Sequence, residues 1–218
     1  MRTMILILTC VAILWGCAGP PAPERPTPAE PAPAPVQPAP VQPAPEPPAT
    51  TNAADYFPYT PGVTAVYEGK GNEFASYTIK VLYKENGLLE WRKETGGTTM
   101  AEVYRLEPQQ VTLIYREGEA YDQAKRLGKP PNVNQSVLKA PITPGTTWKA
   151  DDVTYTILST TESVEAVGKK LSDVVVVEAK HPQSTTRWHF HKTYGMVLSV
   201  FESEGNVIES RLSTFTGP

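Results

Sequence analysis

Cysteine and histidine are scarce in this chain, which limits the chemistry that it can carry. Its 218 residues include two cysteines and three histidines. Because Cys10 and Cys17 both lie near the start, we expect no disulfide in the rest of the protein. No Gly-x-Ser-x-Gly elbow and no EF-hand spacing occurs either. These absences predict a protein that is not an enzyme, that uses no cofactor, and that is stabilised by core burial alone.

An excess of one charge is also lacking, and so are long apolar runs. The chain has 20 Lys+Arg against 23 Asp+Glu, a formal net charge of −3. Because there is no basic stripe, nucleic acid is not an expected partner. The apolar run from Met4 to Trp15 falls short of the roughly 20 residues that cross a bilayer. No later apolar run is long enough, so the sequence predicts no transmembrane helix.

The N-terminal apolar run has the parts of a secretory signal, since a basic residue precedes it and a small residue and a cysteine follow it. The stretch Leu14-Trp15-Gly16-Cys17 resembles the lipobox of bacterial lipoproteins, although a small or aliphatic residue usually stands in the place of Trp15. The resemblance implies that residues 1–16 are a signal peptide and that Cys17 carries lipid. The alternative is an ordinary secretory signal, with a cut at Ala18 and an incidental cysteine.

Residues 17–54 are predicted to be a lipid-anchored cysteine and a disordered Pro/Ala-rich linker. Fourteen of the 23 prolines lie between Pro20 and Pro48, where they prevent both helix and sheet. A polyproline spacer would hold the next domain away from the bilayer, whereas a ligand for a proline-binding groove is the alternative. Two or more acyl chains on Cys17 would keep the protein on a membrane. We therefore expect the extracytoplasmic face of a cell membrane, or the periplasmic side of the outer membrane in a two-membrane cell.

From Asp55 onward the pattern becomes that of β-strands. Apolar and polar residues alternate from Phe74 to Tyr83, and Asn86-Gly87 is a strong hairpin signal. Gly96-Gly97 and Gly205-Asn206 predict further hairpins, while Val174–Val177 predicts a central strand that is buried on both faces. One segment, 119–127, has a briefly helical pattern. Residues 55–218 are therefore predicted to form one β-rich domain.

An internal repeat divides this domain into two halves. Three pairs of segments match in the same order: 58–64 with 141–147, 77–79 with 155–157, and 111–117 with 196–202. The first pair shares Pro-x-Thr-Pro-Gly, in which Pro and Gly suit a type II turn. The repeat predicts duplicated halves of about 56–127 and 139–216. The expected fold is all-β and mainly antiparallel: two similar β-meander halves that form a curved sheet or half-barrel, with little helix.

A resemblance to a family covers roughly residues 56–216. The runs 56–62 (Tyr-Phe-Pro-Tyr-Thr-Pro-Gly) and 67–74, together with 139–148 and 194–197, resemble uncharacterised bacterial lipoproteins, mostly of Gram-positive anaerobes and bacilli. The resemblance implies a lipobox, a variable linker and a β-rich domain. It also implies a shape similar to the curved half-barrel of periplasmic lipoprotein carriers, but no activity.

The apolar face of the curved sheet is the expected place for a ligand. Six side chains are candidates to line it: Tyr77, Ile79, Tyr155, Ile157, Trp188 and Phe190. The alternative is that they form a closed core. The polar segment from Gly118 to Lys139 joins the halves and is a candidate lid or partner-binding loop.

The two histidines His189 and His191 are the remaining candidates for chemistry. They are two residues apart, so they share one face of a strand, while Trp188 and Phe190 face the core. Zinc would need a third ligand, for which His181 or Glu178 is available. The simpler interpretation is a solvated face without metal.

Two functional hypotheses follow from these patterns. The first is a membrane-anchored, non-catalytic binding or scaffold module of the cell envelope, with an envelope protein, glycan or lipid as its partner. The second is a hydrophobic-ligand or lipoprotein carrier or sensor with a cavity on the curved sheet.

Overall fold

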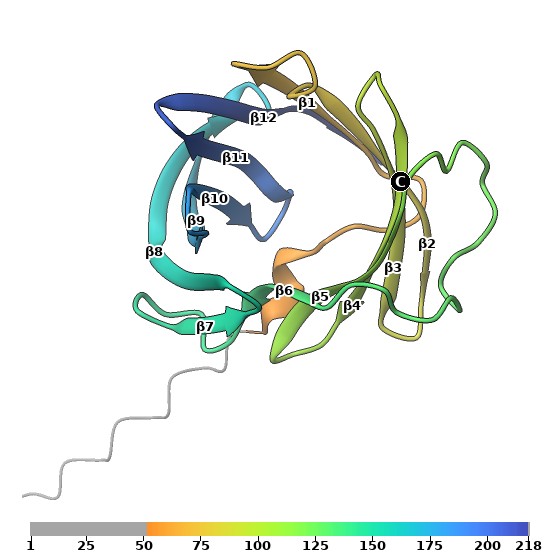
Figure 1. Cartoon of the computed structure of the whole chain (residues 1–218), viewed down its shortest axis with the longest axis horizontal. Helices are drawn as coiled ribbons and strands as arrows, with labels where there is room; N and C mark the ends of the chain where they lie inside the picture. The colour runs from red at the N-terminus through yellow and green to blue at the C-terminus, as the bar shows by residue number, and fades with distance from the viewer. Residues whose placement is uncertain (1–51, 218) are drawn as a thin grey trace, which may run out of the picture. The chain divides into compact units, whose positions relative to one another are not determined.

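The computed structural model describes residues 52–217 (Figure 1). The predicted signal peptide (1–16), Cys17 and almost all of the predicted linker lie outside the described residues. Within residues 52–217, no helix is long and apolar enough to span a membrane.

The regular secondary structure of the described chain is almost all β-strand. In sequence order its elements are the 3-10 helix η1 (Ala53–Tyr56) and the strands β1 (Thr64–Lys70), β2 (Tyr77–Glu85), β3 (Leu88–Glu94), β4 (Thr99–Leu106), β5 (Gln110–Glu117), β6 (Gln135–Lys139), β7 (Thr147–Ala150), β8 (Val153–Ala166), β9 (Lys169–Lys180), β10 (Ser184–His191), β11 (Gly195–Ser203) and β12 (Asn206–Thr216).

These strands form one antiparallel sheet in the order β6-β5-β4-β3-β2-β1-β12-β11-β10-β9-β8-β7. Each half is a six-stranded meander, and the pairing of β1 with β12 joins the halves. The sheet curls until its two edge strands approach one another (Figure 1). There the indole Nε1 of Trp148 on β7 donates to the carbonyl of Ser136 on β6 at 3.0 Å. The predicted all-β fold of two meander halves is confirmed, and its curvature is close to a full turn.

The turn signals account for the hairpins. Asn86 and Gly87 have φ values of 51° and 75°, which suit the primed turn that matches strand twist. The predicted hairpin near residue 205 is also confirmed, with Glu204 and Gly205 as its left-handed residues. Val174–Val177 is buried on both faces, as predicted for a central strand.

The two Pro-x-Thr-Pro-Gly turns make matching hydrogen bonds. Gly62 (φ 92°) donates to the carbonyl of Val81 at 2.9 Å, and Gly145 (φ 90°) donates to that of Ile157 at 2.8 Å. Val81 is therefore the structural counterpart of Ile157, so the match of 77–79 with 155–157 is two residues out of register. A shift of two residues keeps the same face of the strand. The duplication itself remains a prediction.

The helical prediction for residues 119–127 is wrong. This segment is irregular and lies over the face of β3–β5 that points away from Trp91. There Arg92 donates to the carbonyl of Ala124 at 2.9 Å, and Glu90 accepts from the amide of Arg126 at 2.7 Å. Backbone groups that would close a helix are thus bonded to strand side chains, which removes the need for helical hydrogen bonds.

Candidate ligand-binding cavity

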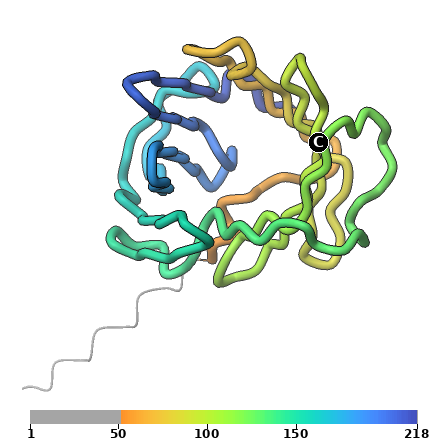
Figure 2. The backbone as a smooth tube through the Cα atoms, in the orientation of Figure 1, coloured from red at the N-terminus to blue at the C-terminus, as the bar shows by residue number. Residues whose placement is uncertain are grey.

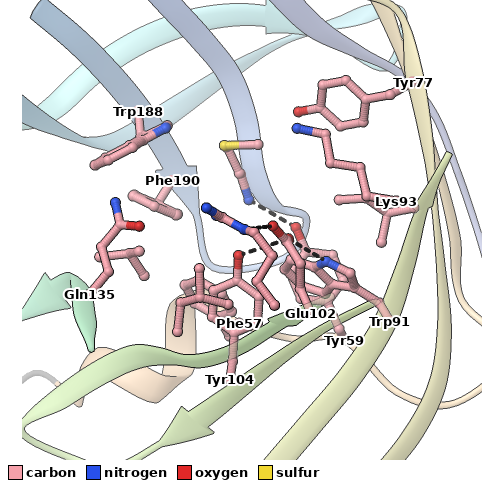
Figure 3. A pocket seen from close by; sticks show the side chains of 15 residues that line it. Phe57, Tyr59, Tyr77, Trp91, Lys93, Glu102, Tyr104, Gln135, Trp188 and Phe190 are labelled. Carbon is pink, nitrogen blue, oxygen red and sulfur yellow. Dashed lines mark hydrogen bonds and ion pairs between the residues drawn. The ribbon is translucent and has the colours of Figure 1, made fainter. Parts of the chain in front are cut away.

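The concave side of the sheet encloses a cavity of about 240 Å³ (Figure 3). Seven of the 15 side chains in its wall are aromatic, and the wall comes from both halves of the domain. The lining side chains are Phe57, Tyr59, Tyr77, Ile79, Trp91, Lys93, Glu102, Tyr104, Leu113, Arg116, Gln135, Val137, Trp188, Phe190 and Met196.

The chain that leaves η1 forms part of this wall. It crosses the space inside the curled sheet before it enters β1 (Figures 1 and 2). The ring of Phe57 lies 5.6 Å from that of Tyr104 in the first half and 5.7 Å from that of Phe190 in the second. This segment therefore packs the two halves against each other and closes one side of the cavity.

A close backbone approach holds this segment in place. The hydroxyl of Tyr59 accepts from the amide of Met196 at 3.1 Å, and that of Tyr67 donates to the carbonyl of Met196 at 2.7 Å. A Cβ on Gly195 would overlap the Tyr59 hydroxyl, so any larger residue there would displace Tyr59. Burial raises the pKa of both tyrosines, which keeps both hydroxyls protonated and leaves that of Tyr67 able to donate.

Glu102 is a buried carboxylate that accepts hydrogen bonds from three side chains. It accepts from Trp91 Nε1 at 2.9 Å, from the Tyr104 hydroxyl at 3.2 Å and from Arg116 Nε at 2.9 Å. The Arg116 side chain is 41% exposed, so this end of the network reaches solvent. The Glu102 charge is balanced by Arg116 and adds no net charge to the cavity.

Lys93 is the other cation in the cavity wall. Its Nζ lies 4.0 Å from the centre of the Tyr77 ring, within reach of a cation–π interaction. Among the described residues, no carboxylate forms an ion pair with it. Burial lowers the pKa of Lys93, Glu102 raises it and Arg116 lowers it, with burial the largest effect. A positive charge is thus held in a half-buried position beside an aromatic ring.

The structure separates the six predicted lining residues into two groups. Four of them line the cavity: Tyr77, Ile79, Trp188 and Phe190. The other two belong to packed core. Tyr155 is stacked between Trp148 and Trp188, at 5.4 and 6.1 Å between ring centres, and Ile157 is fully buried.

The sequence patterns missed several lining residues, among them Phe57, Trp91 and Lys93. In β3 the alternation Leu89, Trp91, Lys93 places a lysine on the same face as two core residues. That inward lysine is the signal that strand alternation could have provided. Phe57 precedes the first strand, and its position depends on the path of the chain through the ring.

His189 and His191 both lie on β10 and are both half-buried. Nδ1 of His189 is buried and has no hydrogen-bond partner among residues 52–217, and burial lowers the pKa of this residue. His191 instead accepts from the amide of Thr193 at 3.1 Å through Nδ1. Within residues 52–217, no group of three His, Cys, Asp or Glu is placed to hold a metal ion. The segment proposed as a lid contributes only Gln135 and Val137, both on β6, to the cavity wall.

No model of a known protein family matches this chain, and no curated protein matches it. Two solved structures are similar in part. A protein of Bacteroides fragilis, described as exported and as having a YmcC-like fold, shares 11% identity at a TM-score of 0.44, over 73% of this chain and 97% of its own. A hypothetical protein of Chlamydia trachomatis shares 5% identity at a TM-score of 0.30, over 76% and 92%. Similarity this low carries no functional argument.

Proposed function

We propose that this protein is a non-catalytic binding module of the cell envelope, which takes a small hydrophobic ligand into the cavity between its two halves. A lipid on Cys17 would hold it on the extracytoplasmic face of a membrane, and the proline-rich segment would space the domain from the bilayer. The observation that carries the binding role is the aromatic cavity of about 240 Å³.

The size of the cavity suits a small ligand. An apolar cavity of about 150 Å³ binds benzene, so the present volume corresponds to roughly ten non-hydrogen atoms. Protein interiors are normally close-packed, and wall atoms beside a void lose dispersion contacts. A domain with only a scaffolding role would gain stability by filling this space. Retention of the space favours an occupant.

A macromolecular partner on the outer surface has weaker support. Contact surfaces for proteins commonly include a contiguous apolar patch. Among residues 52–217, the large apolar side chains that are exposed are few and lie far apart in the sequence: Phe74, Tyr121, Leu158 and Val207. We therefore propose that the ligand binds in the cavity inside the curled sheet.

The binding role can be tested with the mature chain from residue 17, carrying Cys17→Ser so that no detergent is needed. Native mass spectrometry should show a co-purified small molecule, or binding of added octanol. Val137→Phe fills the cavity and should abolish binding. Val207→Phe, at a position that is 55% exposed, is the matched control and should bind normally. If the Cys17→Ser chain without a cavity substitution holds no co-purified ligand and binds no octanol, the proposed role is wrong.

The anchor is tested separately on the full-length chain in a bacterial host. The intact mass of the mature protein should show acyl chains on residue 17, and Cys17→Ser should release the protein from the membrane fraction. A mature N-terminus at another residue, without lipid, would contradict the anchor and leave the cavity proposal untouched.

A further inference from the structure

We infer that the cavity selects ligands that carry an anionic head group on a short apolar body, and that Lys93 pairs with that head group. This inference rests on the proposed function, because it specifies the class of ligand for the same cavity. A medium-chain carboxylate is the simplest compound of this class.

The position of Lys93 is the first argument. On β3 the inward-facing residues are Leu89, Trp91 and Lys93 in turn. An apolar side chain would be expected at the position of Lys93, as at the other two. The Lys93 ammonium contacts the face of Tyr77 and forms no ion pair within the described chain. Lys93 is half-buried, and a charge that is partly removed from water is stabilised by a partner of opposite sign, which a ligand anion would supply.

The charges around the cavity are the second argument. Three charged side chains lie in its wall: Lys93, Glu102 and Arg116. Glu102 and Arg116 are bonded to each other at 2.9 Å, which leaves the charge of Lys93 in excess. One anionic group would therefore neutralise the wall, whereas a cationic ligand would meet uncompensated repulsion.

The arrangement of polar and apolar side chains supplies the orientation. Lys93, Gln135 and Arg116 are half-buried or exposed, while Phe57 and Phe190 are almost fully buried. In Figure 3 Lys93 lies beside Tyr77 on one side of the cavity, and Phe57 and Phe190 lie away from it. A head group at Lys93 would leave the apolar body against these aromatic rings.

The test compares three probes of nearly equal size: octanoate, octanol and octylamine. Their binding to the mature Cys17→Ser chain is followed by the fluorescence of the tryptophans that line the cavity. Octanoate should bind at least about tenfold more tightly than octanol, a difference of about 1.4 kcal/mol, and octylamine should bind most weakly. If octanol or octylamine equals octanoate, the inference is overturned while the binding role stands. If no probe binds, the proposed function fails with it.

The same measurement on variants assigns the selectivity to one residue. Lys93→Met should bring the affinity for octanoate down to that for octanol in the same variant, and continued octanol binding shows that the cavity is intact. Lys93→Arg should retain the advantage, and Lys149→Met, at an exposed position on β7, should behave as the wild type. An unchanged octanoate preference in Lys93→Met would refute the role of this lysine.

The pH dependence is an independent readout. The groups that face Lys93 are Tyr77 from β2, Glu102 from β4 and Arg116 from β5. Since burial lowers the pKa of Lys93, the preference for octanoate should disappear at a less alkaline pH than for an exposed lysine, while octanol affinity stays constant. A preference that does not change up to pH 11 would contradict the inference.

Discussion

Substitution of Glu90 by glutamine removes one buried charge and almost no volume. The Glu90 side chain is fully buried and accepts from Arg92 Nη1 at 2.8 Å and from the backbone amide of Arg126 at 2.7 Å. Arg92 is itself only 4% exposed. In Glu90→Gln the guanidinium would stay buried and lose its counter-charge.

The expected loss of unfolding free energy is about 3 kcal/mol, the lower end of the range for breaking a buried ion pair. The matched control is Glu85→Gln. Glu85 pairs with Lys125 of the same irregular segment, but its side chain is 51% exposed, so the expected loss is below about 1 kcal/mol. Each substitution thus removes one carboxylate that contacts the segment 119–127, and the two differ in how deeply that carboxylate is buried.

Urea unfolding followed by circular dichroism measures both effects. With a slope of about 2 kcal/mol per molar urea, Glu90→Gln should lower the midpoint by roughly 1.5 M, and Glu85→Gln by less than about 0.5 M. Hydrogen exchange should accelerate in residues 118–134 in the first variant, because their anchor to the sheet is lost. Equal midpoints for the two variants would refute the assignment of Glu90 and Arg92 as the anchor.

Three further substitutions test the core. Tyr67→Phe removes the donor to the Met196 carbonyl and should cost about 1 kcal/mol in urea unfolding; an unchanged midpoint would contradict the bond. Gly195→Ala places a Cβ against Tyr59 at a φ of 71°, so thermal unfolding should show a loss of about 2 kcal/mol, and wild-type stability would show that the contact yields. Burial lowers the pKa of His189, so as the pH falls the unfolded chain binds a proton at this residue before the folded chain does. The free energy of unfolding therefore has its full value above pH 6.5 and falls as the pH drops below 6.5. His189→Leu should remove that part of the loss between pH 7 and 5, and identical pH profiles would exclude His189 as its source.

Local signals in the sequence were sufficient for much of the fold. Asn86-Gly87 needs only its own backbone preferences to form a primed turn. Val174–Val177 has no polar face, so it had to be covered on both sides. The segment 119–127 shows where local signals fail. Its conformation is decided by Glu90 and Arg92, which are distant in sequence and are not distinguishable from solvated strand residues by pattern alone.

The cavity was predictable only in part. Trp188 and Phe190 alternate with polar neighbours, and that alternation places them on the concave face. Tyr155 follows the same rule, yet it is stacked against Trp148, because alternation identifies a face but not the depth of packing. Phe57 lies in a segment without periodicity, and its contacts with both halves follow from the closure of the sheet.

The pairing of β1 with β12 also constrains when this domain can fold. Thr64 on the first strand lies opposite Thr216, 152 residues later in the chain. During synthesis β1 therefore keeps one edge unpaired until the last strand has emerged, and an unpaired edge is a template for aggregation. Loss of the 11 residues of β12 would leave two new edges, on β1 and β11, in the middle of the sheet. Proteases and chaperones that act on incomplete chains would thus find the two halves of this domain still unpaired. The halves are joined only by β12, the last strand to be synthesised.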